Sequence, residues 1–128
     1  MIVLDTHAWI WWWSEEPDAL SAAAMRAIET ADEIGISTLC CYEVALAERR
    51  QRVILDRDIR AWIASAVSDE RVRILPPTVE IATQAAALAW EHWDPFDRVI
   101  VATAIVHRAP LVTKDERIRR FQGVATIW

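Results

Sequence analysis

The chain has 128 residues, of which 54% are hydrophobic and 26% are charged, and its net charge is −5. This composition predicts one folded domain and excludes a disordered chain, and no apolar run reaches the roughly 20 residues needed to cross a bilayer. The negative net charge argues against a protein that binds nucleic acid nonspecifically through its overall charge. Two glycines are too few for a glycine-rich phosphate loop.

Histidine and cysteine usage narrows the possible metal chemistry. His7, His92 and His107 lack the His-Glu-x-x-His spacing. The adjacent Cys40 and Cys41 form neither a disulfide framework nor a zinc pattern, which is typical of a reducing compartment. Any metal site must therefore consist mostly of oxygen ligands, which indicates Mg²⁺ or Mn²⁺. Because the N-terminus also lacks the basic segment of a signal peptide, we expect a cytoplasmic protein without membrane contact.

The chain begins with a strand that ends in polar residues. Ile2–Leu4 is a short apolar run, as in a strand buried on both faces. It ends at Asp5 and Thr6, and either side chain could cap a helix over residues 7–12. The elements predicted next are a loop over residues 14–18, a helix from a Ser21 cap to about residue 31, and a strand over residues 34–37.

The helix that follows, with Thr38 as its predicted cap, carries a carboxylate on its apolar face. Leu39, Glu43 and Leu46 share one stripe by their helical spacing, so we expect Glu43 to face inward. The basic run at residues 48–52 ends this helix, where it fits a solvated helix end or a phosphate contact.

The second half of the chain continues the alternation of helices and strands. A further carboxylate, Asp115, directly follows the predicted strand at residues 111–113. The other elements predicted here are a helix from Asp58 to residue 67, a strand at 72–75, a helix capped by Thr78 with Ala89 in its core stripe, a short helix closed by Gly123, and an edge strand over residues 124–128.

The segment Asp-Pro-Phe-Asp-Arg at residues 94–98 opens the most apolar helix of the chain. Asp94 suits the N-cap, Pro95 the first helical position, and Asp97 the position of a capping box. The residues up to 106 are apolar almost all round, which predicts a helix buried on both sides. Charges at its entrance, including Arg98, are expensive to desolvate unless something such as a cation compensates them.

These elements predict an α/β fold, with a mainly parallel sheet of four to five strands flanked by helices in a single domain over residues 1–128. In a parallel sheet the carboxyl ends of the strands share one edge. Asp5, Glu43, Asp97 and Asp115 can therefore converge, although each taken alone also fits a capping or surface role. Four such carboxylates would repel one another unless a cation binds, and with Mg²⁺ they form a site for hydrolysis of phosphate esters.

Four segments of the chain together resemble the signature of PIN-domain proteins, and more closely the VapC toxins of type II toxin–antitoxin pairs. The segments are Ile2 to His7, Ser37 to Glu43, His92 to Arg98, and Leu111 to Asp115. The resemblance implies a Mg²⁺- or Mn²⁺-dependent endoribonuclease that is held inactive by a VapB-like antitoxin and is typically a homodimer.

The resemblance also implies roles for individual residues. It assigns catalysis to Asp5, Glu43, Asp97 and the more variable Asp115, and metal binding to Asp5, Asp97 and Asp115. Three further residues stand where polar groups support the ligands in this family: Thr6, Asp94 and Thr113.

Two other classes of function remain open. A catalytically silent PIN module would bind RNA or protein without metal-dependent cleavage. A phosphoacceptor signalling domain would carry paired acids after the first strand and an acceptor aspartate after a middle one. Here Thr6 and His7 follow Asp5, and the strand at residues 72–75 ends in prolines.

The first helix is crowded with tryptophan. Trp9 suits a core position, but Trp11, Trp12 and Trp13 spread over more of the helix surface than one core stripe can bury. We expect at least one of these three to line a groove that receives an apolar antitoxin segment.

Overall fold

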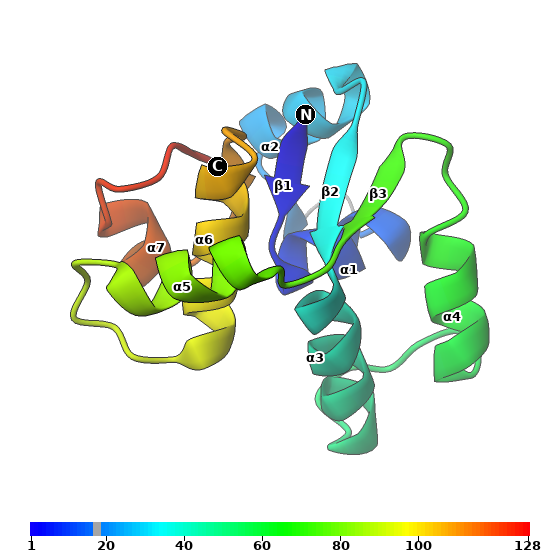
Figure 1. Ribbon diagram of the computed structural model, residues 1–128. Coiled ribbons are helices and arrows are strands. Elements are labelled where there is room, and N and C mark those ends of the chain that lie inside the picture. The colour runs from blue at the N-terminus through cyan, green and yellow to red at the C-terminus, as the bar shows by residue number, and fades with distance from the viewer. Residues whose placement is uncertain (17–18) are drawn as a thin grey trace.

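The computed structural model describes residues 1–16 and 19–128. Residues 17 and 18 of the predicted loop lie outside this part. The helices and strands along the chain (Figure 1) are β1 Ile2–Leu4, α1 Thr6–Trp13, α2 Ala22–Thr30, β2 Ile34–Ser37, α3 Thr38–Arg49, α4 Ile59–Ala66, β3 Val72–Leu75, α5 Val79–Ala87, α6 Pro95–Val106, β4 Leu111–Val112, α7 Glu116–Arg120 and β5 Thr126–Ile127.

The five strands form one sheet in the order β3-β2-β1-β4-β5, and every neighbouring pair is parallel. The prediction of a mainly parallel α/β fold is therefore confirmed. The first strand is central, since Val3 pairs with Gly35 on one side and Leu111 on the other. Gly35 suits this crowded position, because a Cβ there would lie 2.6 Å from the Leu75 side chain.

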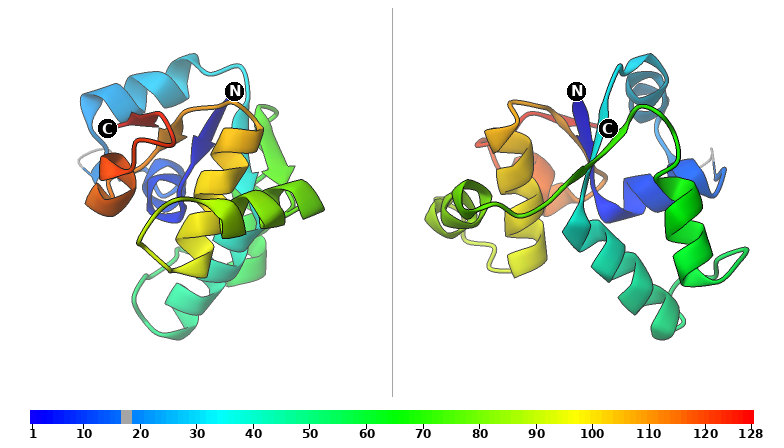
Figure 2. Two further views of the ribbon diagram at one scale, coloured as in Figure 1. Left: turned by 60° about the vertical axis from the view of Figure 1, so that its left-hand side comes forward. Right: turned by 45° about the vertical axis from the view of Figure 1, so that its right-hand side comes forward.

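Helices cover both faces of the sheet, as the right-hand view of Figure 2 shows. α5 and α6 lie on one side, and α1, α2 and α4 lie on the other. Trp9 of α1 and Trp62 of α4 are fully buried and meet edge to face, with ring centroids 5.2 Å apart. As predicted, most of α6 is buried, because it packs between β1 and α5.

Three helix ends differ from the prediction. Ser37, rather than Thr38, caps α3, and its hydroxyl accepts a hydrogen bond from the Leu39 amide. α5 ends at Ala87, so that Ala89 is exposed rather than part of a core stripe. α7 ends at Arg120, before Gly123. At the first helix the structure settles an open choice, because Asp5 is the N-cap and Thr6 is already helical.

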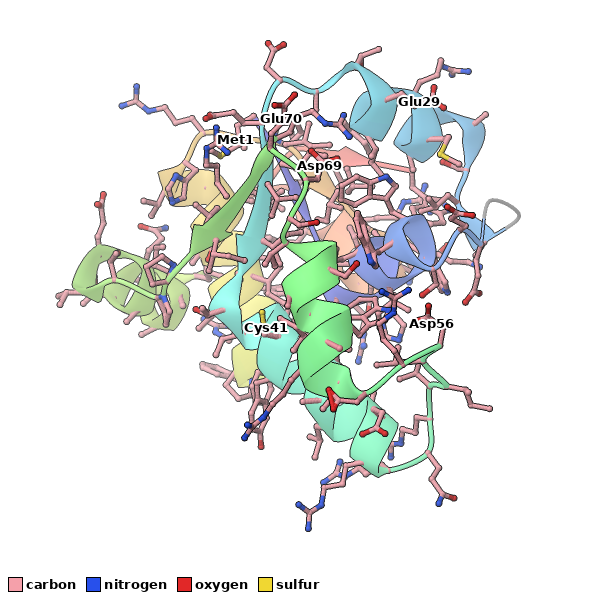
Figure 3. The ribbon with its side chains drawn as sticks, turned by 90° about the vertical axis from the view of Figure 1, so that its right-hand side faces the viewer. Met1, Glu29, Cys41, Asp56, Asp69 and Glu70 are labelled. Atoms are coloured by element: carbon pink, nitrogen blue, oxygen red, sulfur yellow. The ribbon has the colours of Figure 1, made fainter. Side chains whose placement is uncertain are left out.

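The two ends of the parallel strands, where the strands begin and where they end, carry different residues. Asp69 and Glu70, which precede β3, lie at the same end of the molecule as Met1 and Glu29 of α2 (Figure 3). The predicted site residues belong to the opposite edge, where the parallel strands end. Within residues 1–16 and 19–128, no helix is long and apolar enough to cross a membrane.

Candidate active site

Asp5 comes directly after β1 and is almost fully buried, with 8% of its surface exposed. Its Oδ1 accepts the Ala8 amide at 2.7 Å, which caps α1. Burial raises its pKa above the ordinary 3.8, while hydrogen bonds from Thr113 and Ala8 act in the opposite direction. The negative charge of Asp97 raises this pKa further, so the two carboxyl groups are close enough to interact.

Thr113 supports the predicted site from the end of β4. Its side chain is fully buried, and its hydroxyl oxygen accepts the Asp115 amide at 3.0 Å. The same side chain also lowers the pKa of Asp5, so Thr113 acts on two of the four predicted acids.

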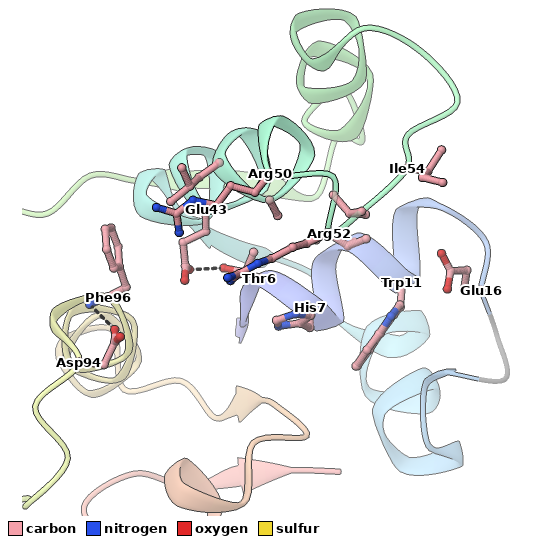
Figure 4. Close-up of a pocket in the computed structure, with 14 residues that line it drawn as sticks. Thr6, His7, Trp11, Glu16, Glu43, Arg50, Arg52, Ile54, Asp94 and Phe96 are labelled. Carbon is pink, nitrogen blue, oxygen red and sulfur yellow. Dashed lines mark hydrogen bonds between the residues drawn. The ribbon is translucent and has the colours of Figure 1, made fainter.

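Glu43 lies on α3 and points toward the start of α1 (Figure 4). The Thr6 hydroxyl donates to Oε2 of Glu43 at 2.5 Å. Burial raises the pKa of Glu43, the bond from Thr6 lowers it, and the charges of Asp97 and Asp94 raise it. The predicted inward orientation of Glu43 and the supporting position of Thr6 agree with these contacts.

Asp97 is the third residue of α6, behind the cap formed by Asp94. Oδ1 of Asp94 accepts the Phe96 and Asp97 amides at 2.9 and 3.2 Å. Instead of completing a capping box, the Asp97 carboxylate turns to His92, whose Nε2 lies 2.6 Å from Oδ2. Burial raises the pKa of Asp97, and the hydrogen bond from His92 partly offsets this.

Asp115 differs from the other three acids because it has a full ion pair. Arg117 donates to it through Nε at 3.2 Å and Nη2 at 2.7 Å. These bonds hold the pKa of Asp115 below its ordinary value. The same Nη2 lies 4.0 Å from Oδ2 of Asp97.

His92 and Arg117 also belong to this site, although neither was predicted from the sequence. His92 precedes Asp97 by five residues, and this nearness in the sequence is the available signal. Arg117 pairs with Asp115 two residues before it, whereas its approach to Asp97 depends on how α7 is placed relative to α6.

The charge of Arg98, in the same segment, is compensated inside the protein. Its buried guanidinium is satisfied by backbone carbonyls, whereas the cation predicted to compensate the carboxylates at the start of α6 stays a prediction. The guanidinium nitrogens donate hydrogen bonds to the backbone carbonyl oxygens of five residues: Ala85, Ala86, Leu88, Trp90 and His92. Trp93 also stacks on the guanidinium at 4.7 Å.

The four acids influence one another electrostatically through Asp97, whose charge raises the pKa of Asp5 and Glu43 and whose own pKa is raised by Asp115. As the side chains are placed, no group of three histidine, cysteine, aspartate or glutamate residues in the described chain surrounds a metal position. Each carboxylate is instead turned to an internal partner. The donor set of carboxylate oxygens nevertheless fits a hard ion such as Mg²⁺ or Mn²⁺, which would replace some of these partners.

A cavity of about 650 Å³ opens beside Glu43 (Figure 4). Its wall combines the site residues Thr6, Glu43 and Asp94 with aromatic Trp11 and Phe96. Arg50 and Arg52, from the basic run that ends α3, also line it. Trp13 lines a separate cavity, and Trp12 packs against Arg71.

The fold and the acidic edge define an α/β protein with a carboxylate-rich site where the parallel strands end. The PIN-domain family model matches residues 2–124. The chain therefore belongs to the PIN-domain family.

The chain is also similar in sequence to one named ribonuclease and in structure to several solved proteins. The chain is 39% identical to Ribonuclease VapC22 of Mycobacterium tuberculosis H37Rv over 99% of its own length and 98% of that protein. A chain of the VapBC2 structure from Rickettsia felis, bound to a promoter DNA fragment, superposes with a TM-score of 0.69 at 18% identity, covering 98% and 97% of the two chains. Mycobacterium tuberculosis VapC20, described as a sarcin–ricin loop cleaving toxin, gives 0.62 at 19% identity, covering 98% and 99%.

Proposed function

We propose that this protein is a metal-dependent endoribonuclease and the toxin of a VapBC-type toxin–antitoxin pair. The observation that carries the proposal is the set of four interacting carboxylates at the carboxyl edge of the sheet. The 39% identity to a named ribonuclease over almost the whole chain supports it.

In this proposal Asp5, Asp97 and Asp115 hold one or two divalent ions, which are Mg²⁺ or Mn²⁺. The ion would supply charge stabilisation to the phosphate oxygens and activate water. Thr113 would support Asp5, whose pKa it lowers, and Asp94 fixes the start of α6 that carries Asp97.

Glu43 is the fourth acid and would act as a proton acceptor. Hydrolysis joins a water oxygen to phosphorus while the bond from phosphorus to the leaving ribose oxygen breaks. Glu43 would take the proton that the water loses, a role suited to a carboxylate with a raised pKa, and the leaving ribose oxygen would gain a proton from solvent water. Thr6 holds the carboxylate in place through its hydroxyl.

The proposed partners are single-stranded RNA as substrate, a VapB-like antitoxin as inhibitor, and a second copy of the chain in a homodimer. A VapB-like inhibitor is supported by the similarity to chains in toxin–antitoxin complexes, such as one from Klebsiella pneumoniae with a TM-score of 0.66 and 23% identity, covering 98% and 97%. We further propose that Trp11 lines the groove that receives the antitoxin, because it shares the cavity with Glu43. A cytoplasmic location fits these partners.

The proposal is tested by Asp5→Asn and Asp97→Asn, assayed for RNA cleavage with and without Mn²⁺. Both changes keep the shape of the side chain but remove a charge that the ion needs, so each should abolish metal-dependent cleavage. Asp32→Asn, in the exposed turn before β2, is the matched control and should cleave like the wild type.

Full activity of both site variants with unchanged metal dependence would contradict the proposal. RNA binding without any metal-dependent cleavage by the wild-type protein would instead favour a catalytically silent module. If the wild-type protein cleaves RNA, mapping the cut sites on total RNA would identify the substrate.

A further inference from the structure

Arg117 places a positive charge beside two of the four acids, Asp115 and Asp97. Its guanidinium binds both oxygens of Asp115, and its Nη2 lies 4.0 Å from Oδ2 of Asp97. In the described part of the chain, no other lysine or arginine forms an ion pair with any of the four acids. One guanidinium thus neutralises two of the three carboxylates that would hold the metal.

The guanidinium and a divalent ion compete for these oxygens. Arg117 already binds both oxygens of Asp115, and a guanidinium and a divalent ion within a few ångströms of each other repel. We therefore expect a metal that binds Asp115 and Asp97 to displace Arg117. The displacement is feasible because the Arg117 side chain is 63% exposed and lies on the short helix α7.

A displaced guanidinium would remain at the rim of the site with its donors free. The groups that best fit its planar fork are carboxylates and phosphates. The carboxylates would be taken by the metal, whereas a bound RNA strand brings phosphates to the same edge. The chemistry of the side chain therefore selects phosphate as its next partner.

We propose that Arg117 is the internal counterion of the metal-free site, that it exchanges with the divalent metal at Asp115 and Asp97, and that it then binds an RNA phosphate. This inference rests on the proposed function, since it assumes metal binding by these acids. It assigns to Arg117 both a competition with the metal and a contact with the substrate.

The competition is tested by titrating metal-free Arg117→Gln with Mn²⁺ in a calorimeter without RNA. In Arg117→Gln the metal no longer has to break the exposed ion pair between Arg117 and Asp115. Mn²⁺ should therefore bind to this variant about threefold more tightly than to the wild type. Arg120→Gln is the matched control, since it removes the same charge from the same helix and Arg120 pairs with Glu116 outside the site. Its Mn²⁺ affinity should match the wild type. Unchanged or weaker affinity in Arg117→Gln would overturn the competition.

The phosphate contact is tested in saturating Mn²⁺ by measuring KM for single-stranded RNA at several salt concentrations. Loss of one phosphate contact should reduce the slope of log KM against log salt by about 0.7 and raise KM in low salt. Arg120→Gln should keep the wild-type slope. An unchanged slope in Arg117→Gln would overturn the contact with RNA.

These outcomes are distinguishable from failure of the proposed function. If the wild-type protein binds no Mn²⁺ and cleaves no RNA, the proposed function and this inference both fail. If the wild type binds Mn²⁺ and cleaves RNA while Arg117→Gln equals Arg120→Gln in both measurements, only this inference fails.

Discussion

The Nε2 atom of His92 lies 2.6 Å from Oδ2 of Asp97, which links the loop before α6 to the third residue of that helix. The His92 ring packs against Trp90 with ring centroids 4.8 Å apart, and its backbone carbonyl accepts Arg98 at 2.9 Å. Trp90 thus positions the ring that contacts Asp97, and Arg98 anchors the His92 backbone. In the proposed metal site, such support would fix the orientation of Asp97.

We expect His92→Ala to reduce RNA cleavage about 10- to 100-fold, the range typical for loss of a partner that orients a metal ligand. The fold should be retained, because the site of the change is a loop. His107→Ala, at the exposed C-terminal end of the same helix, should leave cleavage unchanged. Full activity of His92→Ala would show that Asp97 needs no such support.

Arg98→Met should lower the free energy of unfolding by at least about 3 kcal/mol. The change leaves several buried carbonyls without their charged donor, and hydrogen bonds to charged groups are among the stronger ones. Urea denaturation measures the loss. Arg60→Met, on the exposed face of α4, should cost less than about 0.5 kcal/mol. Equal stability of the two variants would contradict the structural role of Arg98.

Stability should depend on pH through Asp69, which receives three hydrogen bonds from Arg71. These bonds hold the pKa of Asp69 below the ordinary 3.8 in the folded protein. Their stabilisation is therefore present above pH 3.8 and is lost as the pH falls through the lowered folded-state pKa.

Asp69→Asn should cost about 1 kcal/mol at neutral pH, because the pair is partly exposed, and the cost should shrink in acid. Urea unfolding at a series of pH values measures this. Asp56→Asn is the control, since the side chains of Arg57 and Asp56 are 49% and 62% exposed and solvent screens this pair more strongly. A cost for Asp69→Asn that persists unchanged in strong acid would contradict the assignment.

Mn²⁺ should raise the melting temperature of the wild-type protein, because the ion binds the native acids and relieves their mutual repulsion. At one hundred times the dissociation constant the gain is about 2.7 kcal/mol. Asp97→Asn should lose this gain, and without metal its stability should equal or exceed that of the wild type. A wild-type melt that ignores millimolar Mn²⁺ while the protein cleaves RNA would contradict the clustered-acid site.

Trp11→Ala should weaken binding of the antitoxin by more than about 1 kcal/mol in dissociation measurements on the copurified complex. Trp11 lines the cavity beside Glu43, whereas Trp12 packs against Arg71. Trp12→Ala is therefore the comparison and should dissociate more like the wild type. If no change at Trp11, Trp12 or Trp13 weakens the complex, these residues serve the core or contacts between copies.

Much of the site follows from strand ends, which is why the sequence could predict it. Asp5 and Asp115 come just after strands, and in a parallel sheet those ends must share an edge whatever the loops do. Glu43 followed from the helical spacing of its apolar neighbours. The fold class followed from the alternation of helices and strands alone.

What the sequence could not predict depends on long side chains and distant contacts. The helix was expected to continue through Ala89, but α5 ends at Ala87. The carbonyls of Ala85 and Ala86 in its last turn and of the capping Leu88 bind Arg98, a residue of the next helix. The choice of Ser37 over Thr38 as cap is between two adjacent hydroxyls that local propensity treats alike. The nearness of Arg117 to Asp97 joins residues 20 positions apart, so it depends on how α7 packs.

The central position of β1 has a consequence for how the protein comes into being. Val3 pairs with Leu111, so the middle of the sheet joins segments from opposite ends of the chain. Contacts between such distant segments form slowly, because a long loop must close first. On the ribosome, Asp5 emerges early but stays apart from Asp115 until β4 has been synthesised. Under the proposed function, a nascent chain would therefore lack the complete acidic site until β4 and the Asp115 that follows it have been made.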